Sequence, residues 1–264
     1  HAKLANELKT LLLDERVLEP HGFANTYHHW TGQNGATTSS ANNWSDYEYA
    51  NAGITYMTDN GGPQLSWIST MKNKGTKPAT AKVDADLAVL GFEIRGRSDK
   101  ATQTLDLNAQ TLTGRNHIRL ASDGHILLNG GALQSLRWID LLQDASITGS
   151  GTIDADLYHE GQLVVTGTQG ITVTGTYRAS NTATVNMALS GKANTRLNIA
   201  QKATLAGTLF LTTPAGFTPS SGETFTIITA KSISGKFTHN KVTASSGIRF
   251  TIHYTPTTVT LTVD

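Results

Sequence analysis

Two aspartates separated by one residue are the part of this sequence best suited to acid–base chemistry. Asp154 and Asp156 lie in the segment GTIDADLYHEG, and His159 and Glu160 follow closely. Residues i and i+2 of a strand point to the same side of a sheet, so both carboxylates would share one face. Two carboxylates at hydrogen-bond distance share a proton and activate water, as in aspartic peptidases, or flank a glycosidic bond. This pair is the catalytic candidate if the protein is a hydrolase.

The spacing of the pair also raises a geometric objection. Neighbours i and i+2 on one strand are about 6–7 Å apart at the backbone, and the sequence has no D-T-G turn of the aspartic-peptidase kind. A solvated turn or a Ca²⁺-binding loop is the alternative interpretation. The tetrapeptide DADL occurs at both Asp84–Leu87 and Asp154–Leu157. If the fold brought the two copies together, four carboxylates would form a site for a hard cation.

Other residue types that carry chemistry lack the spacing that their chemistry needs. His28 and His29 are adjacent, so a strand would place them on opposite faces, and no H-E-x-x-H motif is present. We therefore predict no metal site. The chain has no G-x-S-x-G motif, no cysteine and no phosphate-binding loop, so no cofactor is predicted. The remaining histidines considered are interpreted as surface or strand positions: His117, His125, His239 and His253.

Aromatic residues gather in the loop-rich stretch 23–80, beside many asparagines and glutamines. Aromatic faces stack on sugar rings while amides bind the hydroxyls, so this region is the candidate binding site. Its members are Trp30, Trp44, Tyr47 and Trp67. The alternative interpretation is that the tryptophans plug the N-terminal end of the β structure.

Period-two alternation of apolar and polar residues dominates the rest of the chain and predicts strands with one buried face. Turn residues separate these runs every eight to twelve positions. We expect an all-β fold in which the following residues are buried: Leu163, Val165, Ile171, Val173, Leu197, Ile199, Leu205, Leu209 and Leu211. Glycines at Gly167, Gly175 and Gly207 are expected at turns or tight corners.

Short apolar pairs followed by glycine, such as LTG, ITG and VTG, are typical of stacked coils with tight corners. This pattern favours a parallel β-solenoid, with a β-sandwich or a solenoid–sandwich hybrid as the alternative. We predict an N-terminal region over residues 1–82, with a helix over 2–19 and an aromatic, loop-rich capping part. A continuous β body follows over 83–264, with an antiparallel C-terminal cap from about residue 212.

Composition limits the functional classes. Only 16% of residues are charged and the net charge is +1, so the clustered basic footprint of nucleic-acid binding is absent. No apolar run reaches the length of a membrane span. A surface rich in hydroxyls and amides, without cysteine, favours a secreted or cell-surface protein among carbohydrate. The sequence does not indicate an oligomeric state.

The segment ATLAGTLFLTTPAGFTPSSGETFTIITAKSISGKF resembles the end of autotransporter-associated β-strand repeat proteins, which are secreted by Gram-negative bacteria. GQLVVTGTQGITVTGTYRAS is similar to their preceding repeats, and YHHWTGQNGATTSSANNWS to their opening. The resemblance covers about two thirds of the chain. It implies a right-handed parallel β-solenoid exposed to the medium, with mucin binding or mucin degradation as a plausible role.

Three functions are compatible with these observations. The leading hypothesis is a secreted or surface module that binds extracellular glycoprotein or glycan such as mucin. The second is a secreted mucin-directed hydrolase, of aspartic-peptidase or glycosidase type, that uses Asp154 and Asp156. The third is a structural stalk segment. The approach of two carboxylates within one cleft would favour the hydrolase.

Overall fold

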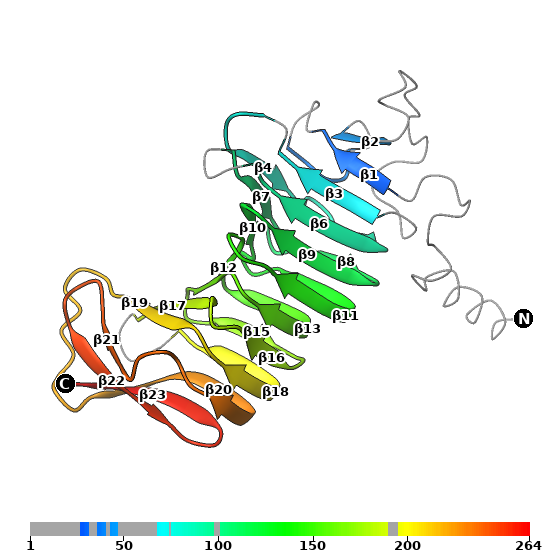
Figure 1. Ribbon diagram of the computed structural model, residues 1–264. Coiled ribbons are helices and arrows are strands. Elements are labelled where there is room, and N and C mark those ends of the chain that lie inside the picture. The colour runs from blue at the N-terminus through cyan, green and yellow to red at the C-terminus, as the bar shows by residue number, and fades with distance from the viewer. Residues whose placement is uncertain are drawn as a thin grey trace, which may run out of the picture.

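The structure is a computed structural model that describes residues 27–31, 36–40, 43–46, 68–73, 75–97, 101–189 and 195–264. The helix expected over 2–19 lies outside the described residues. Short strands stack in coils along one axis, from β1 near one end to β23 near the other (Figure 1). The fold is thus an all-β parallel solenoid with antiparallel strands at its C-terminal end, as the alternation and the glycine-marked corners predict.

One side of the solenoid, here called the third column, is a seven-stranded sheet in which all neighbouring strands run parallel. Its strands are β4 (Ala79–Lys82), β7 (Gln103–Asp106), β10 (Gly124–Leu127), β12 (Ser146–Gly149), β14 (Gln162–Val165), β17 (Thr184–Ala188) and β19 (Thr208–Thr212). Parallel pairing follows from the topology, because each coil returns to this column in the same direction.

A sixteen-stranded sheet forms the rest of the wall and contains two further columns. The first column holds β5 (Leu87–Val89), β8 (Thr111–Gly114), β15 (Ile171–Val173) and the first halves of the long strands. The second column holds β3 (Ile68–Lys72), β6 (Gly91–Arg95), β9 (His117–Ala121), β16 (Tyr177–Ala179) and their second halves. The long strands are β11 (Ala132–Leu141), β13 (Gly151–His159), β18 (Leu197–Leu205) and β20 (Thr224–Gly235).

The apolar side of each strand points into the solenoid and stacks in register on the next coil. Ile147 pairs with Ile126 on one side and Leu163 on the other, and all three side chains are fully buried. Burying one such side chain stabilises the fold by about 1.5–3 kcal/mol. All nine residues expected in the core are buried, from Leu163 to Leu211.

The three glycines expected at corners lie outside the strands. Gly167 and Gly207 have positive φ angles, +72° and +75°, which residues with a side chain rarely adopt. Gly175 lies at the bend between β15 and β16, and a Cβ there would come within 2.5 Å of the Ala155 carbonyl in the preceding coil. The corner therefore needs a residue without a side chain.

A polar pair with aromatic rings lies in the largely apolar interior of the second column. His159 and Tyr177 are each only 1% exposed, and His159 Nδ1 lies 2.6 Å from the Tyr177 hydroxyl. The Nε2 atom of His159 lies 3.0 Å from the Gly161 carbonyl, which can only accept, so Nε2 carries the proton and Nδ1 accepts from the phenol. Burial lowers the pKa of His159 to about 4 and raises the pKa of Tyr177.

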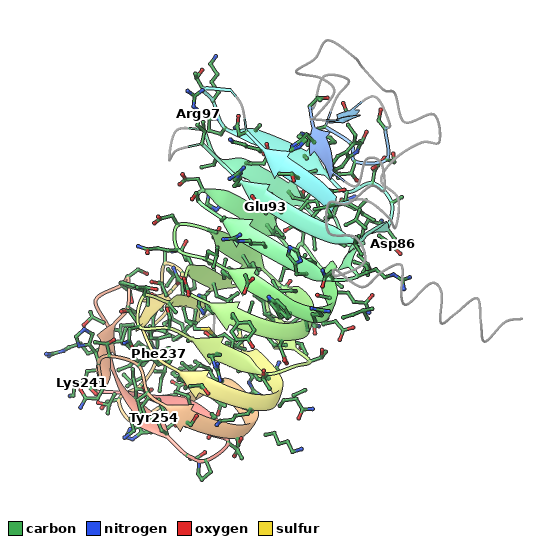
Figure 2. All side chains as sticks on the ribbon, turned by 45° about the vertical axis from the view of Figure 1, so that its right-hand side comes forward. Asp86, Glu93, Arg97, Phe237, Lys241 and Tyr254 are labelled. Carbon is green, nitrogen blue, oxygen red and sulfur yellow. The ribbon has the colours of Figure 1, made fainter. Side chains whose placement is uncertain are left out.

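The C-terminal cap begins where strand direction reverses. β20 pairs parallel with β18, whereas its other neighbour, β23 (Thr258–Val263), runs antiparallel to it. β22 (Arg249–Tyr254) and β21 (Lys241–Thr243) complete the antiparallel part, in which Phe225 and Phe250 pack edge to face at 6.1 Å. Figure 2 labels Phe237, Lys241 and Tyr254 in this cap, where the Tyr254 hydroxyl accepts the backbone N–H of Phe237.

Candidate ligand-binding face and corner groove

Asp154 belongs to a ladder of side chains that runs from coil to coil on the outside of the first column. Its Oδ1 accepts from the Thr174 hydroxyl at 2.5 Å, and its Oδ2 accepts from the Gln134 amide at 2.9 Å. Gln134 Oε1 in turn accepts from the Thr113 hydroxyl at 3.1 Å. The hydrogen bonds from Thr174 and Gln134 hold the pKa of Asp154 below its usual value, because they stabilise the ionised carboxylate.

Asp156 lies in the second column and has a different partner. Its Oδ1 accepts the backbone N–H of Thr176 at 2.6 Å, and its Cα is in register with that of Trp138. Two carboxylates that share a proton are hydrogen-bonded to each other, whereas Asp154 accepts from Thr174 and Gln134 and Asp156 accepts from Thr176. The structure therefore supplies separate partners for Asp154 and Asp156 and gives Asp154 the environment of an ionised group.

The two copies of the DADL tetrapeptide share one contact. Asp86 accepts the backbone N–H of Thr111 at 2.8 Å, as Asp156 accepts that of Thr176. In both copies the second aspartate thus satisfies a donor in the following coil. Leu87 nevertheless pairs within the first column, and Leu157 within the second. The described residues contain no group of three or more His, Asp and Glu side chains arranged to hold a metal ion.

Trp30 and Trp44 close the N-terminal part of the described core. Trp30 ends β1 (Tyr27–Trp30) and Trp44 begins β2 (Trp44–Asp46), and the two pair antiparallel. The indoles are 7% and 4% exposed and pack edge to face at 5.3 Å, with Trp44 Nε1 donating to the Thr38 carbonyl. This is the geometry of the plug interpretation, since neither ring is open for stacking. Tyr47 and Trp67 lie outside the described residues.

The outer face of the second column carries two rows of polar and aromatic side chains. One row has alternating charge followed by an aromatic residue, and its members are in register from coil to coil: Glu93, Arg119, Asp140, Tyr158 and Arg178. The second row consists of His117, Trp138 and Asp156. Figure 2 labels Glu93, which begins the first row on β6.

Trp138 and Tyr158 give this face its two aromatic rings. Tyr158 is 40% exposed, and the guanidinium carbon of Arg178 lies 5.8 Å from its ring centroid. Trp138 is partly exposed, donates from Nε1 to Asp140 Oδ2 at 3.1 Å, and has the Arg137 guanidinium 5.8 Å from its ring. Fixed rings between carboxylates and guanidinium groups form a platform for a ligand with both apolar and hydroxyl-bearing surfaces.

A groove of about 270 Å³ lies at the corner where the second column turns into the third. The groove and the aromatic platform share one strand end, since Glu160 in the groove lining follows Tyr158 by two residues. Polar side chains from four successive coils line most of it: His125, Gln143, Asp144, Ser146, Glu160, Gln162, Thr182 and Thr184. No lysine or arginine is among the lining residues.

His125 and Ser146 make direct contact in this groove. His125 Nδ1 lies 2.7 Å from Ser146 Oγ, and the two residues are in register on β10 and β12. Gln162 is in register with Ser146 on the other side, on β14. Burial lowers the pKa of His125 below its usual value, and the nearby charge of Asp123 acts in the opposite direction.

Sequence reasoning overlooked the platform and the groove. Trp138 lies next to buried Ile139, and Tyr158 lies between buried Leu157 and His159. Strict alternation places both aromatic side chains outside, so the period-two pattern already contained this signal. The contact between His125 and Ser146 depends on coil register, which no local pattern reveals.

Comparison with protein-family models, curated proteins and solved structures finds no match to this chain. The structure confirms the β-solenoid that the resemblance to β-strand repeat proteins implies. Among the described residues no helix has the length and hydrophobicity of a membrane span.

Proposed function

We propose that this protein is a secreted or cell-surface module that binds extracellular glycans or glycoproteins such as mucin through the outer face of its second column. The observation that carries the proposal is the pair of fixed, outward-facing rings, Trp138 and Tyr158, between charged side chains in register. A sugar ring has apolar C–H faces and a rim of hydroxyls. Such a ring stacks on an aromatic side chain while neighbouring carboxylates and guanidinium groups bind the hydroxyls.

The shape of the solenoid supports binding to an extended ligand. Equivalent positions in neighbouring coils of a parallel sheet repeat about every 4.8 Å. Side chains along the second column therefore form a regular series from Glu93 to Arg178. Such a series suits a polymer lying along the stack, and the corner groove at Glu160 offers space for a substituent of that polymer.

Secretion is proposed on composition and on the resemblance to autotransporter-associated repeats. The chain has no cysteine and few charged residues for its size. The hydrolase alternative has less support, because Asp154 and Asp156 are held by different partners. The stalk alternative leaves the partly exposed ring of Trp138 and the exposed ring of Tyr158 without a ligand-binding role.

Binding to immobilised mucin, followed by biolayer interferometry, tests the proposal. We expect Trp138→Ala and Tyr158→Ala each to weaken binding by about tenfold, because an aromatic contact contributes about 1 kcal/mol or more. Phe210→Ala is the matched control, since Phe210 is an aromatic side chain, 52% exposed, on β19 of the third column. Unchanged binding by both platform variants would exclude this face. Trp67→Ala in the same assay tests the role predicted for that residue.

Cleavage of purified mucin separates the binding module from the aspartate hydrolase. The binding proposal expects no cleavage of peptide or glycosidic bonds by the wild type. Cleavage that disappears in Asp154→Asn or Asp156→Asn at unchanged melting temperature would support the hydrolase instead, because an amide cannot exchange the proton. Cleavage that persists in both variants would locate the chemistry at other residues.

A further inference from the structure

The corner groove contains a second constellation, independent of the aspartates. Three consecutive coils place His125, Ser146 and Gln162 side by side on the outer face of the third column. The groove gives a ligand access to all three residues. Imidazole, hydroxyl and amide are the groups that acyl transfer uses as base, nucleophile and oxyanion donor.

We propose that Ser146 and His125 form a nucleophile–base pair that hydrolyses small carboxylic esters bound in the corner groove. Ser146 Oγ and His125 Nδ1 are 2.7 Å apart, which is within the range for direct proton transfer between nucleophile and base. The pair resembles a dyad rather than a triad, because no carboxylate of the described residues is hydrogen-bonded to the imidazole. A dyad of this kind suits esters, whose alkoxide leaves more readily than an amine.

The protonation state of His125 fits the role of base. Burial disfavours the imidazolium, so the ring is neutral at pH 7 and can accept the serine proton. Asp123 is the nearby charge and favours the imidazolium that forms during the reaction. Besides His125, the ionisable residues that line the groove are Asp144 and Glu160.

Gln162 is the side chain placed to stabilise the developing oxyanion. It is in register with Ser146 on the side opposite His125, so base and amide flank the nucleophile at about the 4.8 Å spacing of neighbouring strands. The Gln162 side chain is exposed in the groove, and its amide can donate to the oxygen of a carbonyl attacked by Ser146.

The reaction balances with water as the only co-substrate. Ser146 Oγ bonds to the acyl carbon while its proton passes to His125 Nδ1. The bond from that carbon to the alcohol oxygen breaks, and the alcohol leaves with the proton. Water then attacks the acyl-serine and gives a proton to His125, which returns it to Ser146 Oγ as the carboxylic acid departs.

If the proposed glycan binding is correct, the alcohol is a sugar hydroxyl and the substrate is an O-acylated glycan. That assignment rests on the proposed function, whereas the ester chemistry does not. The test therefore uses two probes without sugar, p-nitrophenyl acetate for turnover and a biotinylated fluorophosphonate that bonds to activated serines.

For the wild type we expect ester turnover and fluorophosphonate attachment at Ser146, located by peptide mass spectrometry. Ser146→Ala and His125→Gln should each lower kcat/KM by about 100-fold or more. His253→Gln and Ser234→Ala are the matched controls, since His253 is exposed on β22 and Ser234 forms a hydroxyl pair with Thr204 away from the groove. Gln162→Leu should lower kcat more than it raises KM, because the oxyanion contact forms in the transition state.

Turnover that survives in Ser146→Ala, or labelling spread evenly over surface serines, would overturn the proposal. The labelling experiment uses the wild type alone, so it stays decisive if either variant fails to fold. Ester hydrolysis without mucin binding would refute the proposed function and leave this inference standing. Mucin binding without ester hydrolysis or labelling would refute this inference and leave the proposed function standing.

Discussion

The interiors of the third and second columns are built differently, although both stack one residue per coil in register. One stacked row of the third column is aliphatic through six coils: Leu105, Ile126, Ile147, Leu163, Val185 and Leu209. The second column follows Phe92, Ile118, Ile139, Leu157, Tyr177 and Ala203, and its neighbouring row contains His159. The stacked aliphatic row depends on apolar burial alone, whereas the second column at Tyr177 and His159 also depends on a hydrogen bond and on a proton.

The difference shows how a solenoid accommodates a polar pair. Each ring has an alanine in register in the next coil: Ala179 beside His159, and Ala203 beside Tyr177. Small neighbours provide space for the two rings, and the rings satisfy each other and the Gly161 carbonyl. A buried polar group that is hydrogen-bonded costs little, while the same group without a partner costs about 1–3 kcal/mol. The two interiors should therefore respond differently to truncation, pH and loss of a single hydroxyl.

The largest effect is expected from truncation in the aliphatic row. Leu163→Ala should lower the free energy of unfolding by about 2–5 kcal/mol, because Leu163 is fully buried between Ile147 and Val185. Chemical denaturation measures the change, and Val164→Ala, on the outer side of the same strand, is the control. Similar losses in both variants would mean that the strand register is wrong.

The pH dependence of stability should distinguish the second column. His159 titrates near 4 in the folded protein and near 6.5 in the unfolded chain. Between these values the unfolded chain binds more protons, so the free energy of unfolding should rise by about 3 kcal/mol from pH 4 to 6.5, and this contribution should be constant above. Urea unfolding across this range measures it.

The control for the pH experiment is His159→Leu combined with Tyr177→Phe. This double variant removes the buried titrating group and leaves no polar atom of the pair without its partner. Its pH dependence should be smaller than that of the wild type by the amount assigned to His159. An unchanged profile would show that other groups dominate acid sensitivity.

Loss of one hydroxyl should have an intermediate effect. Tyr177→Phe leaves His159 Nδ1 buried without a donor, so we expect a loss of about 1–3 kcal/mol at pH 7. The double variant should be more stable than the sum of the two single variants predicts, because the second substitution removes the unsatisfied group. Strict additivity in a double-mutant cycle would contradict the hydrogen bond.

The smallest effect is expected on the outside of the first column. Asp154→Asn should change the free energy of unfolding by less than about 1 kcal/mol, because the ladder with Gln134 and Thr174 is partly exposed and the amide keeps one acceptor. Thermal melting compares this variant with Leu163→Ala. A loss comparable to that of the leucine variant would place more of the stability in the outer ladder than this comparison assigns.

Local sequence pattern predicted the fold because the period-two code and the corner glycines are both local. Leu163 and Val165 could be assigned to the interior from their own neighbours, and Gly175 could be assigned to a corner. Pairing between coils is not local. The separation of Asp154 from Asp156 into two columns depends on which strand lies beside β13, and this is decided by the lengths of several corners.

The candidate site was less predictable for the same reason. Trp138 and Tyr158 come from different coils, and only register places them on one face. His125 and Ser146 are separated by 20 residues of intervening chain and meet because one coil lies on the next. The same alternation that identifies the core leaves the outer side chains unspecified, so their neighbours appear only once the coils are stacked.

The reversal of strand direction at the cap ends the series of parallel coils. β20 presents a parallel neighbour on one edge and an antiparallel neighbour on the other, and the outermost strand, β21, has only three residues. The ion pair between Lys241 and Asp264 lies at this outer edge. A second copy that offered a further parallel coil would meet a short, charged strand of the wrong polarity. Addition of a parallel coil from a second copy is therefore disfavoured at the β21 edge.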